Sequence, residues 1–183
     1  MKPETHWLRM CGTADLQRLV RNVADFPKPG IAFKDITPLL ADPAGLALAV
    51  ELMVQPFRAQ HVDLVCGAES RGFIFGTAVA RDLSAGFVPI RKPGKLPWRT
   101  RRHEYELEYG TDSLEIHEDA IQAGQRVLIV DDLLATGGTL AACCGLVTGL
   151  GGEVVAVAVL IELTALCGRE RLADYPVYSV IGC

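Results

Sequence analysis

One stretch decides the fold of this chain: VLIVDDLLATGGT, residues 127–139. It holds four apolar residues, then the adjacent carboxylates of Asp131 and Asp132, then a loop of small residues that leads into an apolar helical pattern. An uninterrupted apolar run is typical of a parallel strand that is covered on both faces. Because ligands of open α/β sheets bind just past the carboxyl ends of such strands, we expect a binding site at these two carboxylates.

The residues of this stretch suit a sugar phosphate. Carboxylates such as Asp131 and Asp132 can accept hydrogen bonds from ribose hydroxyls. Gly137 and Gly138 lack the Cβ atoms that would keep an anion away from the backbone. The Thr139 hydroxyl and the free N–H groups that open the next helix would hold a phosphate. The chain contains neither a P-loop nor a GxGxxG dinucleotide fingerprint. A strand–turn–helix corner without a ligand is the alternative.

The composition indicates a globular protein with a single domain, residues 1–183. Half of the residues are apolar, 22% are charged, and the net charge is −4. No overall basic field favours nucleic acid, and the longest apolar run, residues 154–161, is too short to span a bilayer. The six cysteines form no Cys-x-x-Cys pair and the four histidines have no zinc-ligand spacing. We therefore expect reduced thiols in a cytoplasmic protein and no zinc site.

The order of elements along the chain predicts an α/β fold. Helical spacing indicates helices over residues 13–24 and 46–57, with Pro56 kinking or ending the second. Residues 91–106 are polar, basic and contain proline, which predicts a mobile loop before a short hairpin. Strands that alternate with helices predict a central parallel sheet flanked by helices, with right-handed crossovers. The expected strands are residues 62–66, 87–90, 107–109, 112–116, 127–130, 154–161 and 177–181, and further helices are expected to end near residue 83 and to cover residues 138–150.

Several segments, in one order along the chain, resemble type I phosphoribosyltransferases that act on adenine. The resemblance runs from about residue 16 to residue 173. It implies the fold of that family, with a small N-terminal hood formed mainly by residues 13–40 and a flexible catalytic loop of residues 91–110. The segments are FPKPGIAFKDI (26–36), ESRGF (69–73), RKPGKLP (91–97), YELEYG (105–110), DDLLATGGT (131–139) and ELT (162–164).

The resemblance implies transfer of the 5-phosphoribosyl group from phosphoribosyl pyrophosphate (PRPP) to adenine, which gives AMP and pyrophosphate in purine salvage. It also implies a homodimer and Mg²⁺ that is held mainly by PRPP and water, without a direct protein ligand. Asp131 and Asp132 would hold the ribose hydroxyls, directly or through that metal. No nucleic acid and no membrane is expected as a partner. The rivals are a phosphoribosyltransferase for another base and a non-catalytic regulator that senses PRPP.

The resemblance also assigns the groups that meet the phosphates. Arg71 would present a planar fork of donors to the pyrophosphate, in a loop whose Glu69–Ser70 peptide is cis in the family. Lys92 would be a second pyrophosphate contact, and Arg91 would reach the site of a neighbouring subunit. The residues implied to bind PRPP are Ser70, Arg71, Arg91, Lys92, Lys95, Asp131, Asp132, Ala135, Thr136, Gly137, Gly138 and Thr139.

One glutamate of the loop is expected to perform acid–base chemistry at the purine ring. Alternation along residues 105–109 places Glu106 and Glu108 on the same face, so spacing does not choose between them. The resemblance selects Glu108, beside Tyr109 in the loop. We therefore expect Glu108 and Arg71 to be the catalytic residues.

Base recognition rests on the resemblance alone. Phe33 would stack on one face of adenine and Leu163 would pack against the other. Backbone groups of Ala32 and Lys34 would read the Watson–Crick edge, where hypoxanthine offers an oxygen in place of the amine of adenine. Because that mismatch leaves polar groups unpaired, such a site can reject hypoxanthine strongly. Without the resemblance, Phe33 and Leu163 would simply be core residues.

Overall fold

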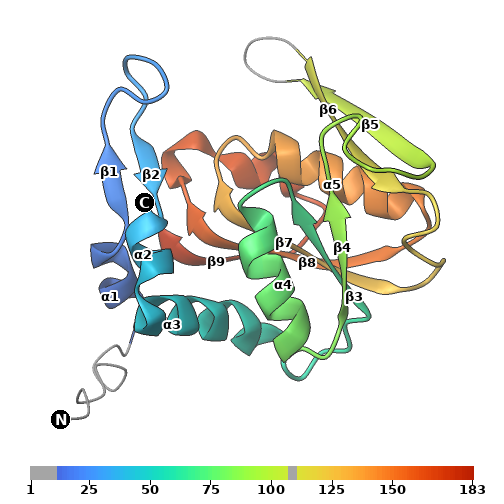
Figure 1. Ribbon diagram of the computed structural model, residues 1–183, viewed down its shortest axis with the longest axis horizontal. Helices are drawn as coiled ribbons and strands as arrows, with labels where there is room; N and C mark the ends of the chain where they lie inside the picture. The colour runs from blue at the N-terminus through green and yellow to red at the C-terminus, as the bar shows by residue number, and fades with distance from the viewer. Residues whose placement is uncertain (1–11, 107–110) are drawn as a thin grey trace. The chain divides into compact units, whose positions relative to one another are not determined.

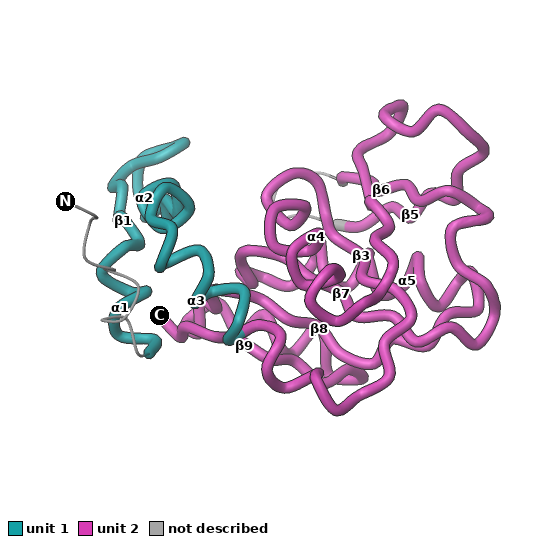
Figure 2. The backbone as a smooth tube through the Cα atoms, turned by 60° about the horizontal axis from the view of Figure 1, so that its bottom comes forward, with its two compact units in different colours: residues 1–52 teal, residues 53–183 magenta. Residues whose placement is uncertain are grey.

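The computed structural model describes residues 12–106 and 111–183 (Figure 1). The chain divides into two compact units, residues 1–52 and residues 53–183 (Figure 2). The larger unit contains residues 127–139, and its sheet positions the candidate site.

The larger unit is built on a parallel sheet of five strands in the order β4-β3-β7-β8-β9. Every neighbouring pair of strands is parallel. In the middle strand, residues 127–130 are fully buried, as expected for a strand that is covered on both faces. The predicted central parallel sheet is therefore confirmed. The strands are β3 (Leu64–Ala68), β4 (Gly86–Ile90), β7 (Arg126–Leu134), β8 (Glu153–Glu162) and β9 (Val177–Gly182).

Two helices of the larger unit, α4 (Gly72–Asp82) and α5 (Gly138–Gly149), follow β3 and β7 directly. The crossovers from β3 to β4 and from β7 to β8 run in opposite directions along the sheet. Because such crossovers are right-handed, they place the two helices on opposite faces of the sheet. On the face under α5, Val127 and Ile129 share one hydrophobic core with Cys143 of the helix.

Residues 100–106 form a strand, so the prediction of a loop over this segment is wrong. Strand β5 (Thr100–Glu106) pairs antiparallel with β6 (Thr111–His117). One face of β5 lies against α5, where Arg101 donates a hydrogen bond to the carbonyl of Gly149 and His103 contacts the same helix. An alternating apolar pattern does not mark this strand, because Arg101 and His103, which face the helix, are polar.

The described part of the smaller unit contains two short helices, α1 (Thr13–Arg18) and α2 (Thr37–Ala41), and a hairpin. Strand β1 (Arg21–Val23) pairs antiparallel with β2 (Phe33–Asp35). The helix predicted over residues 13–24 is therefore wrong beyond Arg18, because the backbone groups of β1 bond across to β2 instead of along a helix.

Helix α3 (Pro43–Val54) bears out the second predicted helix, including its end. The helix stops at Val54, and the 3-10 turn η2 (Gln55–Phe57) holds Pro56. A proline lacks the N–H group that would continue the helical ladder. Within the described residues, α3 and α5 have 12 residues each, and no helix is long and apolar enough to cross a membrane.

Candidate active site

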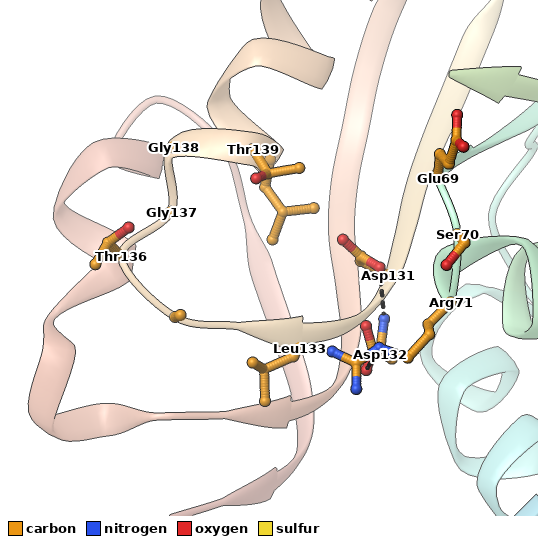
Figure 3. A pocket seen from close by; sticks show the side chains of 12 residues that line it. Glu69, Ser70, Arg71, Asp131, Asp132, Leu133, Thr136, Gly137, Gly138 and Thr139 are labelled. Atoms are coloured by element: carbon orange, nitrogen blue, oxygen red, sulfur yellow. Dashed lines mark hydrogen bonds and ion pairs between the residues drawn. The ribbon is translucent and has the colours of Figure 1, made fainter. Parts of the chain in front are cut away.

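The candidate site lies where the connections of the sheet change direction. Strand β3 lies between β4 and β7, and the chain leaves β3 and β7 toward opposite edges of the sheet. Such a switch point opens a crevice at the carboxyl ends of the two strands. A pocket of about 320 Å³ lies there, lined by residues 69–71 after β3 and by residues 131–133 and 135–140 from β7 into α5 (Figure 3).

This pocket brings together nine of the twelve residues that the resemblance assigned to PRPP. They come from two loops that are about sixty residues apart in the sequence, and the sheet register places those loops side by side. The peptide between Glu69 and Ser70 is cis, as predicted. The nine residues are Ser70, Arg71, Asp131, Asp132, Ala135, Thr136, Gly137, Gly138 and Thr139.

Both carboxylates lie inside strand β7, and not after its end as the sequence predicted. The strand continues to Leu134 because β8 is long enough to pair with it, up to Leu134 opposite Glu162. Adjacent side chains of a strand point to opposite faces. Asp131 therefore shares the α5 face of the strand with Val127 and Ile129, and a Cβ on Gly72, the first residue of α4, would lie 2.8 Å from its Oδ1 atom. Asp132 turns instead toward Arg71 (Figure 3).

The carboxylate pair carries more negative charge than its surroundings neutralise. Burial raises the pKa of Asp131 well above its usual range, and the neighbouring charge of Asp132 raises it further. Burial also raises the pKa of Asp132, although the Arg71 guanidinium opposes this effect. Arg71 Nε lies 3.0 Å from Asp132 Oδ2, yet this buried oxygen accepts no aligned hydrogen bond. A ligand that supplies hydroxyl donors or a cation would relieve this imbalance.

The loop at residues 135–139 delivers the chain to the N-terminus of α5. Gly137 precedes the helix with φ 84°, a backbone conformation that favours glycine. A Cβ on Gly137 would also lie 2.4 Å from the carbonyl oxygen of Gly168. A missing Cβ at Gly137 would therefore admit an anion to the backbone, as predicted, and it also allows this close contact between two backbone segments. The first N–H groups of α5, which have no partners within the helix, open into the same pocket.

Arg91, Lys92 and Lys95 do not line the described pocket. Glu69 holds two of them beside it: its carboxylate accepts hydrogen bonds from Arg91 Nε at 3.2 Å and from the Lys92 backbone N–H at 3.0 Å. Burial raises the pKa of Glu69, but these hydrogen bonds outweigh burial and leave the pKa below its usual value. The Lys95 carbonyl accepts a hydrogen bond from Arg91 Nη1 at 3.3 Å.

A chain of polar contacts joins the pocket to the β5–β6 hairpin. The Tyr105 hydroxyl lies 3.4 Å from Thr139 Oγ1 and 3.1 Å from Asp112 Oδ2. The same carboxylate of Asp112 receives the ammonium group of Lys92. Sequence reasoning did not single out Asp112, and only the antiparallel register, which sets it opposite Tyr105, reveals its role.

The remaining predicted residues are not among those that line this pocket, or they lie outside the described part. Glu108 and Tyr109 belong to residues 107–110, which the structure does not describe, as does the expected strand 107–109. Leu163 follows the last residue of β8 in the larger unit. The residues predicted to bind the base, Ala32, Phe33 and Lys34, belong to the smaller unit, where the Phe33 ring makes an edge-to-face contact with Phe26 at 5.1 Å.

The described residues offer few metal ligands. Over residues 12–106 and 111–183, no three His, Cys, Asp or Glu side chains gather into a group that could hold a metal ion. Five cysteines in these ranges are free, and the buried Cys66, Cys143 and Cys144 have raised pKa values because burial disfavours the thiolate. Glu69 also lines the pocket, but its carboxylate accepts hydrogen bonds from Arg91 and Lys92. The β7 carboxylates Asp131 and Asp132 are therefore better placed to contact a cation which a substrate brings with it.

Comparison with known proteins assigns the family. The phosphoribosyl transferase domain matches residues 35–181. An adenine phosphoribosyltransferase from Koribacter versatilis is 58% identical over 166 residues, which cover 91% of each chain. Another from Rhodopirellula baltica is 58% identical over 167 residues, which cover 91% of this chain and 81% of the relative.

Solved structures agree with this assignment. The adenine phosphoribosyltransferase of Rhodothermus marinus superposes with a TM-score of 0.90 at 55% identity and covers 93% of this chain and 98% of its own. The enzyme of Saccharomyces cerevisiae, in complex with an imino-altritol bisphosphate and adenine, gives a TM-score of 0.87 at 38% identity and covers 92% and 97%. With its parallel sheet, its switch-point pocket and these relatives, the chain belongs to the phosphoribosyltransferase family and, within it, to the adenine phosphoribosyltransferases.

Proposed function

We propose that this chain transfers the 5-phosphoribosyl group from PRPP to adenine and releases AMP and pyrophosphate, as an enzyme of purine salvage. The observation that carries the proposal is the pocket at the carboxyl ends of β3 and β7, where two carboxylates, an arginine and a helix N-terminus meet. The yeast relative was solved with a sugar-like bisphosphate and adenine bound together. A pocket of this chemistry fits the same pair of ligands.

The 5-phosphate of PRPP fits the loop that precedes α5. Residues 135–139 line the pocket and lead into the helix. Backbone N–H groups at a helix N-terminus bind anions well, because they lack partners and carry the positive end of the helix dipole. The Thr139 hydroxyl supplies a further donor. Asp131 and Asp132 would then accept hydrogen bonds from the two ribose hydroxyls.

The pyrophosphate fits the other side of the pocket. Arg71 has five N–H donors, so it can hold Asp132 and still present donors to phosphate oxygens. The Ser70 hydroxyl lines the same wall. We propose that Lys92 joins Arg71 at the pyrophosphate by leaving Asp112, that Lys95 adds charge nearby, and that Arg91 serves the neighbouring subunit of a homodimer.

Mg²⁺ fits the pocket as a companion of PRPP. The buried Asp132 Oδ2 oxygen accepts no aligned hydrogen bond, and Mg²⁺ is commonly bound through one or two carboxylates with substrate phosphates and water. When bound, the metal would neutralise phosphate oxygens that gain charge as pyrophosphate leaves. Asp131 and Asp132 are the residues that would face it, directly or through water.

The proton chemistry and the base contacts are proposed from the family resemblance. Glu108 would act at the imidazole nitrogens of the purine, with Tyr109 beside it, while Phe33, Leu163 and the backbone at Ala32 and Lys34 would hold the base. Positioned proton transfer contributes roughly 10²–10⁴ in rate. Glu108→Gln should therefore lower turnover by about that factor and leave PRPP affinity nearly unchanged. A loss of only a few-fold would contradict this assignment.

The wider setting of the enzyme is also proposed. The hood, mainly residues 13–40, and the loop of residues 91–110 would belong to a single catalytic domain. A cytoplasmic location suits free, buried thiols. Gel filtration with light scattering would test the homodimer, since a dimer has twice the mass of the 19.8 kDa chain.

A panel of bases tests the proposed reaction. The protein is incubated with PRPP and Mg²⁺ and with adenine, hypoxanthine, guanine or xanthine in separate reactions, and nucleotide and pyrophosphate are measured. AMP from adenine alone is the expected result. Product from a 6-oxopurine would mean that the base pocket is misassigned while the PRPP site stands. PRPP binding without any product would favour a regulator that senses PRPP.

A further inference from the structure

We propose that Glu162, Arg169 and Ser179 form a positioning unit. This unit fixes the backbone of residues 135–139, the loop proposed to bind the 5-phosphate, which we call the 5-phosphate loop. The proposal deepens the proposed function and rests on it. These three residues lie outside the lining of the described pocket. They would act on the substrate only through the backbone between them and the loop.

The three side chains form a compact, fully paired network. Glu162 is the last residue of β8 and is only 7% exposed. Its Oε1 atom accepts a hydrogen bond from Arg169 Nε at 2.6 Å, and its Oε2 atom accepts from Arg169 Nη2 and from Ser179 Oγ, both at 2.7 Å. Arg169 Nη1 also donates to the Val177 carbonyl at 2.8 Å. A two-pronged, charge-assisted pair of this kind fixes orientation as well as position.

The network is joined to the 5-phosphate loop by backbone contacts. Arg169 directly follows Gly168, and these two residues open the 3-10 helix η4 (Gly168–Leu172). A Cβ on Gly168 would lie 2.2 Å from the Ala135 carbonyl oxygen, and a Cβ on Gly137 would lie 2.4 Å from the Gly168 carbonyl oxygen. At both points a glycine allows the two backbones to approach each other without a Cβ between them. A displacement of Arg169 therefore passes directly to Ala135 and Gly137.

The other end of the network is joined to the end of strand β7, which leads directly into the same loop. Leu163 follows Glu162, and its backbone N–H donates to the carbonyl of Leu134 at 2.9 Å. The segment between Glu162 and Arg169 is thus tied to the strand and loop at both of its ends. Arg169 lowers the pKa of Glu162, so the carboxylate stays ionised at neutral pH and the pair stays charged.

The same two strands offer a control pair at their opposite ends. Arg126 opens β7 and Glu153 opens β8, and they form an ion pair at 2.7 Å. Neither residue lines the described pocket. If the effect of the positioning unit were only on general stability, loss of this second arginine–glutamate pair would have the same kind of consequence.

The test measures KM for PRPP, KM for adenine and kcat in Glu162→Gln, Arg169→Met and Arg169→Lys, at a temperature where each variant is fully folded. Residues that couple to a site through a packed network typically change binding by roughly 2- to 30-fold. We expect KM for PRPP to rise by about that factor in Glu162→Gln and Arg169→Met. Arg169→Lys should recover part of the loss because it keeps the charge.

Product binding separates positioning from loss of stability. Calorimetry should show that AMP, which carries the 5-phosphate, binds more weakly in Glu162→Gln, while pyrophosphate binds as in the wild type. Arg126→Met and Glu153→Gln should leave every constant within about twofold. An unchanged KM for PRPP, equal weakening of AMP and pyrophosphate, or an equal effect of the control pair would each overturn the inference. Wild-type AMP formation tests the proposed function separately, because its absence would contradict that function before any variant is compared.

Discussion

The two ends of strand β7 lie among charged residues of the same kinds in opposite electrostatic states. At the amino end, every principal charge is paired. Asp63 accepts a hydrogen bond from the Arg126 backbone N–H at 2.8 Å and lies 2.9 Å from His61 Nε2. Arg126 in turn pairs with Glu153 at 2.7 Å. The hydrogen bond from Arg126 is the main reason that the pKa of Asp63 lies below its usual value.

At the carboxyl end of β7, the surroundings of Asp131 and Asp132 disfavour their ionised forms. Burial raises the pKa values of both Asp131 and Asp132, and Arg71 only partly offsets this. The neighbouring glycines are crowded against backbone and carboxylate atoms, with Gly72 close to Asp131 and Gly137 close to Gly168. A folded chain tolerates such features where a ligand later satisfies them.

One strand can therefore serve both the stability of the fold and the binding of a ligand. Residues 127–130 between the two ends are fully buried and hold the strand in place. Because the middle is rigid, the amino end can be optimised for the free protein while the carboxyl end is optimised for the bound substrate. Substitutions at the two ends should therefore have opposite consequences.

The largest expected effect comes from Asp131→Asn. A hydrogen bond to a charged group contributes about 1.5–3 kcal/mol, so loss of the charge at the ribose should lower kcat/KM by roughly 10- to 100-fold. The same change removes a carboxyl group whose ionisation burial disfavours, so the free energy of unfolding should exceed that of the wild type once the pH rises above the usual carboxyl range. Steady-state kinetics and urea unfolding measure the two effects.

The matched change at the amino end is Asp63→Asn. It should leave kcat/KM unchanged. It should lower the free energy of unfolding, because it removes a carboxylate whose ionised form the fold stabilises. Asp131→Asn with full activity, or with reduced stability at pH 8, would break the contrast between the two ends.

A smaller effect is expected from two glycines that share one backbone conformation. Gly124, in the turn before β7, and Gly137, before α5, both have φ 84°. A Cβ on Gly124 would meet nothing within 4 Å, whereas one on Gly137 would lie 2.4 Å from the Gly168 carbonyl oxygen. Gly124→Ala should cost about 1–2 kcal/mol from the left-handed backbone alone and leave activity intact.

Gly137→Ala adds a clash to the same backbone cost, so its loss of stability should exceed that of Gly124→Ala. It should also weaken AMP binding, because the displaced backbone belongs to the loop that would hold the 5-phosphate. Thermal unfolding and calorimetry with AMP measure these effects. Equal stability losses in the two variants would show that the contact with Gly168 relaxes freely. Backbone shifts would then not be transmitted through this contact to the 5-phosphate loop.

Much of the sheet and part of the site could be predicted from the sequence. The apolar run 127–130, the carboxylates Asp131 and Asp132 and the glycine loop are local features, and local order along the chain was enough to locate them. Strand β8 was likewise found because its apolar run is uninterrupted, and helix α5 was found because an apolar helical pattern follows the glycine loop. The cis peptide after Glu69 was found only through the family resemblance.

The features that sequence reasoning missed depend on contacts between distant segments. The extension of β7 through Leu134 depends on pairing with β8, and strand β5 depends on the surface of α5. Ser179 reaches Glu162 only through the parallel register of β8 and β9. No periodicity in the sequence reports such pairings, because each strand by itself is compatible with several neighbours.

The smallest expected effect is the dependence of stability on pH, which should have opposite signs at the two ends. The folded pKa of Asp131 is raised, so its contribution to stability is present below the unfolded value near 3.8 and is lost as the pH rises through the folded pKa. The wild type should therefore lose stability relative to Asp131→Asn as the pH rises from about 4 toward 8. The folded pKa of Asp63 is lowered, so its contribution is present above 3.8 and is lost as the pH falls through the folded pKa. The wild type should lose its advantage over Asp63→Asn only below about pH 4. Urea unfolding of the three proteins at several pH values measures both differences, and two differences with the same sign would mean that the ends of the strand are electrostatically alike.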